Sequence, residues 1–127
     1  MAARPYVLYG LRNCDACRRV RRALEWADVD WRFHDLRAEG VDADQVSDWL
    51  ERLGAITLLN RRSRAWRELS AAERELPDDA SVQALLVRVP TLIRRPLLQT
   101  PEGRIASGRD AETVAAAAGQ SEGDGTT

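Results

Sequence analysis

The first third of the chain alternates between short apolar runs and one amphipathic stretch. Residues 6–9 form an apolar run that ends at Gly10, which is typical of a buried strand. Apolar residues then recur at i, i+3, i+4 and i+7 within residues 20–27, which predicts a helix with one buried face. Near-alternation over residues 31–36 predicts a second strand. Because a strand, a helix and a strand of this combined length make a βαβ unit, we expect the two strands to be parallel.

The middle of the chain has a helical pattern. Apolar positions at helical spacing predict helices over residues 46–53 and 82–89. Between them, Ser70 is followed three residues later by Glu73, the sequence signature of a capping box, which predicts another helix. Together these patterns predict an all-helical insert over about 42–89.

The last part of the chain returns to strands. Two short strand-like runs flank Pro101-Glu102-Gly103, which indicates a hairpin. A final helix is predicted from Asp110 to Gly119, and the small polar residues 119–127 predict a disordered tail. The order β-α-β, helical insert, β-β-α predicts an α/β chain with a thioredoxin-like fold, organised as a single domain over residues 1–118.

Composition narrows the classes of function. The chain has 127 residues, of which 44% are hydrophobic, and a formal net charge of −1, so nothing predicts binding to nucleic acid. No apolar stretch reaches the length of a membrane span, and the first residues lack the apolar core of a signal peptide. We therefore expect a cytoplasmic protein, monomeric and without a membrane partner. All 19 basic residues are arginine, so an arginine at any single position is weak evidence for a site.

The two cysteines, Cys14 and Cys17, are the strongest candidates for chemistry. They are separated by two residues and lie where the first strand ends and the first helix begins. A thiol at a helix N-terminus is stabilised as the reactive thiolate, and Arg18 and Arg19 add positive charge nearby. Cys17 lies one turn further on, within reach of Cys14. The pattern predicts that Cys14 attacks and that Cys17 resolves the product.

The thiols allow two other interpretations. A zinc site needs about four ligands, and His34 with some carboxylates is all that could join the cysteines, so no metal is expected. Two inert core thiols remain the alternative, since free cysteine packs as a small hydrophobic residue. His34, on the second predicted strand, is interpreted as structural. The tryptophans are interpreted as core or helix-packing residues: Trp26, Trp31, Trp49 and Trp66.

Three segments together resemble a known family. The stretches YGLRNCDACRRVRRALEWADVDWRFHDLR, LLNRRSRAWREL and IRRPLL, the last followed by a glycine-containing hairpin, resemble the ArsC/Spx/YffB family. This family contains the glutaredoxin-coupled arsenate reductases and their relatives, and the resemblance extends from Tyr6 to about Ala117. It is strongest to the YffB branch, which implies a glutathione-dependent thiol reductase with a thioredoxin-like fold. No tightly bound cofactor is implied. Glutathione would be the co-substrate, a glutaredoxin- or thioredoxin-type protein the reductant, and a small oxidised thiol or an oxyanion the substrate.

The resemblance also implies roles for individual residues. Cys14 matches the catalytic cysteine, and Pro96 matches a proline that is cis in this fold. The resemblance implies that Arg95, Arg62 and Arg109 bind the anionic part of a substrate or of glutathione; Arg18 and Asn13, which adjoin the cysteines in the sequence, are further candidates for that role. Arg61 competes with Arg62 for its position in the family pattern.

Two departures from the family pattern bear on function. The spacing of the cysteines is that of Spx-type regulators, in which the pair forms a disulfide switch and the protein binds RNA polymerase. A redox-sensing regulator is therefore the alternative to a reductase, and a family member with neither activity is the third hypothesis. In addition, Asp15 and Ala16 replace the glycine and hydroxyl residues that follow the cysteine of arsenate reductases. A carboxylate beside the anion site disfavours arsenate as the substrate.

Overall fold

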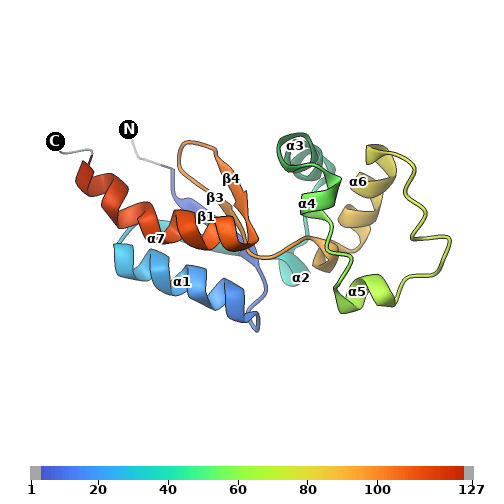
Figure 1. Ribbon diagram of the computed structural model, residues 1–127, viewed down its shortest axis with the longest axis horizontal. Helices are drawn as coiled ribbons and strands as arrows, with labels where there is room; N and C mark the ends of the chain where they lie inside the picture. The colour runs from blue at the N-terminus through green and yellow to red at the C-terminus, as the bar shows by residue number, and fades with distance from the viewer. Residues whose placement is uncertain (1–3, 125–127) are drawn as a thin grey trace. The chain divides into compact units, whose positions relative to one another are not determined.

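The computed structural model describes residues 4–124 of the chain. These residues fold into two compact units (Figure 1). One unit, the sheet unit, contains the described residues of Met1–Asp35 and Arg95–Thr127, and the other, the helical unit, is Leu36–Arg94. The helical unit contains the predicted insert, 42–89, and extends beyond it at both ends.

The helices and strands alternate along the chain as the pattern of apolar residues predicts, with several short helices in addition. In chain order they are β1 (Tyr6–Gly10), α1 (Asp15–Ala27), β2 (Trp31–Asp35), α2 (Leu36–Glu39), α3 (Ala43–Leu53), α4 (Ala55–Leu58), α5 (Arg64–Arg67), α6 (Asp79–Arg88), the 3₁₀ helix η1 (Pro90–Leu92), β3 (Leu97–Gln99), β4 (Ile105–Ser107) and α7 (Gly108–Asp124).

The sheet unit is built on a four-stranded sheet in the order β2-β1-β3-β4. Strands β1 and β2 are parallel, with Tyr6 opposite Trp31 and Gly10 opposite Asp35, which confirms the predicted βαβ unit. Strands β3 and β4 pair in an antiparallel hairpin, also as predicted, and β3 is antiparallel to β1. The sheet is therefore mixed, and the α/β, thioredoxin-like prediction is confirmed.

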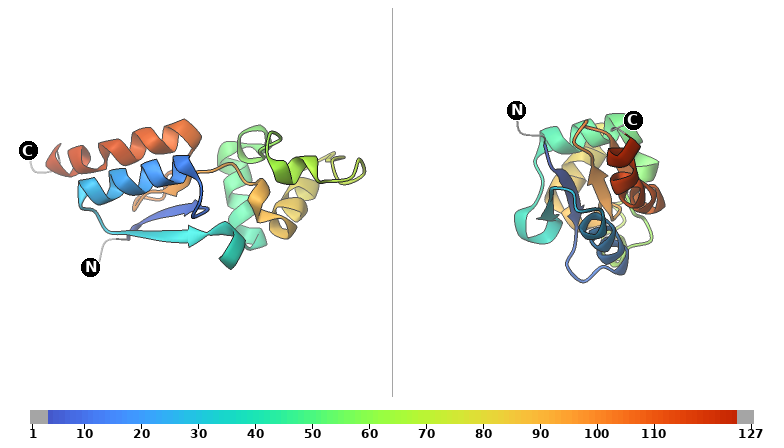
Figure 2. Two further views of the ribbon diagram at one scale, coloured as in Figure 1. Left: turned by 90° about the horizontal axis from the view of Figure 1, so that it is seen from below. Right: turned by 90° about the vertical axis from the view of Figure 1, so that its left-hand side faces the viewer.

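Helices α1 and α7 lie side by side on one face of this sheet (Figure 2). The periodic apolar residues of α1 supply its buried face, where Val20 and Leu24 are fully buried. They belong to a core cluster that also contains Leu8, Leu98, Ala106, Ala111 and Ala115. The small alanines of α7 let that helix pack closely, because they fill little space between backbone and sheet. Burial of this face is the main stabilising contribution to α1, since an isolated helix of this length is marginal in water.

The helical unit is held by caps and a compact apolar centre. Asp42 and Asp78 each accept a hydrogen bond from the amide three residues on, and each forms a capping box at the start of its helix, α3 and α6. The apolar faces of these two helices contact each other. The buried residues that these faces contribute are Val46, Trp49, Leu50, Val82, Leu85 and Leu86. Cap and apolar face thus specify the same boundaries for each helix.

Three expectations need correction. Ser70 and Glu73 do exchange the hydrogen bonds of a capping box, at 2.8 and 3.2 Å, but residues 71–74 form only a turn, because no run of apolar positions follows to bury a helix face. Helix α7 continues past Gly119, where the sequence predicts its end, to Asp124, and the remainder of the predicted tail, 125–127, lies outside the described residues. Trp26 is 92% exposed and is not a packing residue.

Among residues 4–124, none of the helices is long and apolar enough to cross a membrane.

Candidate active site

Cys14 occupies the junction that the sequence predicts, as the N-cap residue of α1. Its backbone is extended, with φ −102° and ψ 121°, and its carbonyl accepts a hydrogen bond from the Arg18 amide at 3.0 Å. Upstream, its own amide donates to the Leu11 carbonyl at 3.4 Å, which closes the loop between β1 and the helix. The side chain makes no conventional capping hydrogen bond and is half-buried. The thiol is thus held at the open, positive end of α1 and stays accessible.

Cys17 has a different environment, one turn into the helix. Its side chain is fully buried, and no disulfide joins it to Cys14. Gly10, the last residue of β1, provides the space for it. A Cβ on Gly10 would overlap the Cys17 sulfur and would lie 3.3 Å from the Cys17 Cβ. A side chain at position 10 would therefore displace Cys17.

The two environments separate the pKa values of the thiols. Burial raises the pKa of Cys14. The amide and thiol of Cys17, the positive charge of Arg95 and the Ala16 amide together lower it by more than burial raises it, so the net pKa is below its ordinary value. The pKa of Cys17 is raised to about 12. Burial is the largest cause and the neighbouring Cys14 contributes to the rise, while the Leu11 backbone and Arg95 act in the opposite direction. Cys14 is therefore the thiol that the fold activates, and Cys17 is the one that it keeps protonated.

Arg95 is an arginine distant in the sequence that the structure brings near both thiols. It is half-buried, and its positive charge lowers the pKa of both Cys14 and Cys17, so the guanidinium lies within electrostatic range of both sulfurs. The Arg95–Pro96 peptide bond is cis, the isomer that the family resemblance implies. Pro96 is buried, and its carbonyl accepts a hydrogen bond from the Gly108 amide at 2.8 Å, which ties this segment to the start of α7.

The other predicted anion-binding residues of the sheet unit are placed less favourably. Arg18 donates a hydrogen bond to the Asp15 carboxylate at 2.6 Å and is thereby occupied. Asp15 is thus not an uncompensated charge beside the nucleophile, as the sequence suggests, but one half of an exposed ion pair. Asn13 and Arg109 are exposed, in the loop before α1 and in the first turn of α7.

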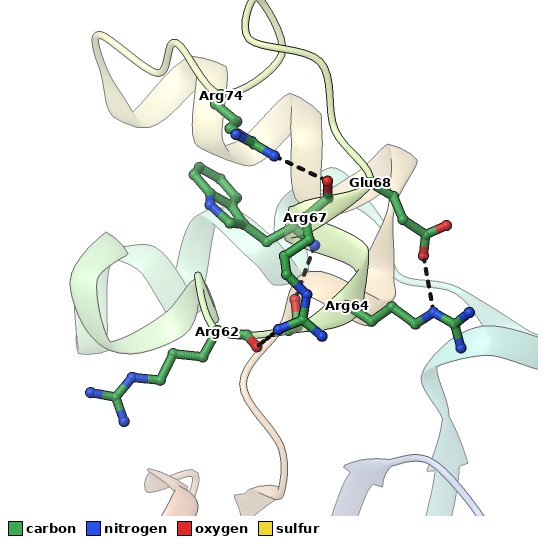
Figure 3. Close-up of polar contacts among 7 residues, drawn as sticks. Arg62, Arg64, Arg67, Glu68 and Arg74 are labelled. Carbon is green, nitrogen blue, oxygen red and sulfur yellow. Dashed lines mark hydrogen bonds and ion pairs between the residues drawn. The ribbon is translucent and has the colours of Figure 1, made fainter.

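Arg62 belongs to the helical unit. Its backbone is held at both ends: its amide donates to the Asn60 side chain at 3.0 Å, and its carbonyl accepts from Arg67 at 3.5 Å. Figure 3 shows its side chain directed away from α5. The competing residue, Arg61, is instead stacked over the Trp66 ring at 5.5 Å. Neither guanidinium makes a hydrogen bond or ion pair within residues 4–124, but that of Arg61 is stacked on Trp66, so Arg62 is the more available of the two to an anion.

Two residues near the thiols have roles that the sequence did not predict. Gly10 seats Cys17, and the available signal is a glycine ending the strand just before the cysteine loop. Arg12 holds that loop against β2, with Nε 3.6 Å from an Asp35 carboxylate oxygen and the guanidinium 5.7 Å from the Phe33 ring centre.

His34 packs its ring against that of Tyr9, with 4.8 Å between the ring centres. In the part of the chain that the structure describes, no group of three His, Cys, Asp or Glu side chains is arranged to hold a metal ion.

Comparisons with known proteins agree with this geometry. The model of the ArsC family matches residues 9–117 of the chain. A solved structure of a YffB protein superposes with a TM-score of 0.79 at 35% identity, covering 88% of this chain and 97% of that one. An arsenate reductase-related protein from Brucella melitensis superposes with a TM-score of 0.65 at 31% identity, covering 85% and 89%. The global transcriptional regulator Spx of Lactiplantibacillus plantarum is 24% identical over 94 residues, which are 72% of this chain and 70% of that protein.

Proposed function

The chain belongs to the ArsC family, and from this premise we propose that it is a thiol-dependent reductase with Cys14 as its nucleophile. The observation that carries the proposal is the contrast between the two thiols. Cys14 is accessible at the N-terminus of α1 with a lowered pKa, whereas Cys17 is buried with a pKa of about 12. Two thiols three residues apart with opposite pKa shifts are typical of a nucleophile and its partner. Two inert core cysteines would both be buried, and neither would have a lowered pKa.

The reaction proposed is thiol–disulfide exchange. The Cys14 thiolate attacks one sulfur of an oxidised substrate, a new disulfide forms between Cys14 and that sulfur, and the other sulfur leaves as a thiolate that takes up a proton. Arg95 stabilises the Cys14 thiolate and is placed to attract an anionic group such as a carboxylate of glutathione. A second thiolate then attacks the Cys14 adduct and releases Cys14 as a thiolate again.

Glutathione is the better candidate for that second step. The raised pKa of Cys17, due first to burial, makes its thiolate rarer at neutral pH than that of an ordinary free thiol, which is ionised at the level of about a few per cent. Burial is the largest cause of the raised pKa, and it persists after Cys14 is modified. We therefore infer that glutathione, as co-substrate, resolves the Cys14 adduct, and that attack by Cys17 on the same adduct is slower. If Cys17 does react, the Cys14–Cys17 disulfide would need a dithiol protein of the glutaredoxin or thioredoxin type to reduce it.

The proposed substrate is an oxidised thiol in preference to arsenate. The loop after Cys14 offers Asp15 and Ala16 and no side-chain donor for an oxyanion, although Arg18 offsets the charge of Asp15. The likeness to an arsenate reductase-related protein supports membership of the family. In the proposal, the enzyme acts in the cytoplasm as a monomer.

A redox-sensing regulator of the Spx type is the second candidate. The C-x-x-C spacing and the likeness to Spx favour it. Such a regulator would bind RNA polymerase, and a Cys14–Cys17 disulfide would switch that binding. The raised pKa of Cys17 counts against rapid formation of the disulfide.

Mass spectrometry of the full chain after treatment with oxidised glutathione separates these candidates. A reductase should carry one glutathione on Cys14, removed by added glutathione. Cys17→Ser should behave the same way, and Cys14→Ser should remain unmodified. Rapid loss of two hydrogens in place of glutathione addition, together with oxidant-sensitive retention on immobilised RNA polymerase α-subunit, would favour the regulator.

A further inference from the structure

The exposed side of α1 carries a line of arginines. Cys14 precedes this line at the N-terminal end of the helix, and an exposed tryptophan, Trp26, follows it. We call Arg18, Arg21, Arg22 and Trp26 the α1 stripe. Arg18, Arg22 and Trp26 follow one another at intervals of four residues, so they lie along one side of the helix, and Cys14 precedes Arg18 by four residues at the N-cap. Arg18 and Arg22 are exposed and Trp26 is 92% exposed. A reactive thiol, a cationic surface and an unburied aromatic ring therefore share one rigid element.

The charge of the stripe is only partly neutralised. Arg18 pairs with Asp15, but neither Arg21 nor Arg22 forms an ion pair with any residue in the range 4–124. Helix α1 carries four arginines and two acidic residues, whereas the chain as a whole has a formal net charge of −1. The positive charge is therefore local to this helix. A surface of this kind is complementary to an acidic partner.

The surface between the arginines is hollowed. A cavity of about 200 Å³ is lined by Arg18, Arg21, Arg22 and Glu25. It is smaller than the roughly 300–1,000 Å³ of a typical small-molecule pocket. Carboxylate side chains fit such a space, because each can accept paired hydrogen bonds from a guanidinium. Glu25 disfavours a carboxylate at its own end of the cavity and Arg18 already pairs with Asp15, so Arg21 and Arg22 define the favourable part.

Trp26 gives the stripe a second anchor and a length. Tryptophan and arginine are the residue types most enriched among those that dominate binding energy at protein interfaces. The twelve steps along the chain from Cys14 to Trp26 span roughly 18 Å at 1.5 Å per residue. An extended peptide covers that distance with about five or six residues at 3.3 Å each. A short segment could thus place a sulfur at Cys14 and an apolar side chain on Trp26.

We propose that the α1 stripe docks an acidic segment of a protein partner, so that Cys14 exchanges with protein disulfides flanked by acidic residues. The inference rests on the proposed function, because it names a substrate class for the same thiol. In the exchange, the Cys14 thiolate bonds to the cysteine sulfur of the segment, and the sulfur formerly bonded to that cysteine leaves as a thiolate.

The test uses three synthetic hexapeptides, each with an N-terminal cysteine joined in a disulfide to 5-thio-2-nitrobenzoate. The four middle residues are Glu, Gln or Lys, and the last residue is Leu. Release of the coloured thiolate from each peptide by the full chain gives a second-order rate constant. At low ionic strength the acidic peptide should react at least about tenfold faster than the basic one, and added salt should reduce that ratio.

Variants then locate the effect. Arg21→Glu/Arg22→Glu should reverse the order of acidic and basic peptides, while the neutral peptide keeps its rate within about twofold and so reports an intact Cys14. Arg104→Glu, in the β3–β4 hairpin, is the control for charge alone and should preserve the order. Trp26→Ala should slow the reaction of the acidic peptide. For an acidic peptide that ends in Gln in place of Leu, Trp26→Ala should leave the rate unchanged.

Equal rates for acidic and basic peptides, or an order that survives the double charge reversal, would overturn the docking surface. Failure of the proposed function looks different. In that case neither oxidised glutathione nor any of the three peptides would modify Cys14.

Discussion

Gly10 and Cys17 are in direct contact: the bare α-carbon at the end of β1 leaves the space that the Cys17 side chain fills. A Cβ at position 10 would overlap the Cys17 sulfur. The contact joins the strand to the helix that carries the reactive thiol, so the seat of Cys17 and the placement of Cys14 depend on the same packing.

Gly10→Ala should therefore destabilise the protein. Both residues are buried, so the extra methyl group must displace Cys17 or the strand, and overpacking of this kind costs about 1–3 kcal/mol. Urea denaturation gives the free energy of unfolding of the variant. Cys17→Ala removes the sulfur, so Gly10→Ala/Cys17→Ala should be more stable than the sum of the single changes predicts, by about 1 kcal/mol. Strict additivity would show that the contact does not constrain the fold.

The two thiols should differ in their reaction with iodoacetamide as a function of pH. The pKa of Cys14 lies below its ordinary value and that of Cys17 lies near 12, so Cys14 should be alkylated at neutral pH while Cys17 stays intact. Peptide mapping after alkylation at a series of pH values gives both profiles. Arg95→Gln removes a positive charge that favours the thiolate and should move the Cys14 profile to higher pH. Parallel profiles for the two cysteines would contradict the proposed division of roles.

Cys17 should make stability depend on pH in the alkaline range. Its pKa rises from the ordinary 9.0 in the unfolded chain to about 12 in the fold, so the fold favours the protonated thiol. That contribution is fully present below pH 9 and is lost as the pH rises toward the folded-state pKa. Between about pH 9 and pH 10.5 the free energy of unfolding should fall by roughly 1–2 kcal/mol from this group.

Urea denaturation with a reductant present, compared with Cys17→Ala, isolates that contribution of Cys17. The variant lacks the thiol and should show a flatter dependence over the same range. Identical curves for the two proteins would mean that Cys17 ionises in the fold as easily as in the unfolded chain.

The pair formed by Asp15 and Arg18 should modulate any reaction with arsenate. The 2.6 Å contact is exposed, so the charge of Asp15 is screened by solvent as well as by Arg18. We expect weak arsenate reduction with glutathione and glutaredoxin, and Asp15→Gly should raise it by only about two- to fivefold. Asp15→Gly/Arg18→Gln removes both charges and should return the rate toward that of the unmodified protein.

An arsenate assay on the three proteins, normalised to the rate with a glutathione mixed disulfide, gives the comparison. Strong arsenate turnover by the unmodified protein that falls in Asp15→Gly would show that the carboxylate assists an oxyanion in place of repelling it.

The local pattern of the sequence determined the elements of the sheet unit and the position of the reactive thiol. Alternation and helical periodicity act over a few residues, so β1, α1 and β2 could be predicted with their parallel pairing, and Cys14 with its N-cap position. Likewise, the turn residues 101–103 specified the hairpin of β3 and β4. Where periodicity was absent, as after Ser70, a local cap signal alone predicted a helix that the chain does not form.

Only the tertiary structure decided what lies around those elements. The pKa of Cys17 depends on Gly10 and on the burial of one face of α1, and the charge beside Cys14 comes from Arg95, which is 81 positions away along the chain. The family pattern around Pro96 singled out Arg95, but nothing local showed that Arg18 turns to Asp15, or that Trp26 stays exposed while Trp49 is buried. Burial and long-range charge depend on which segments meet in space, and that is a property of the packed chain, because no short stretch of residues contains its own neighbours.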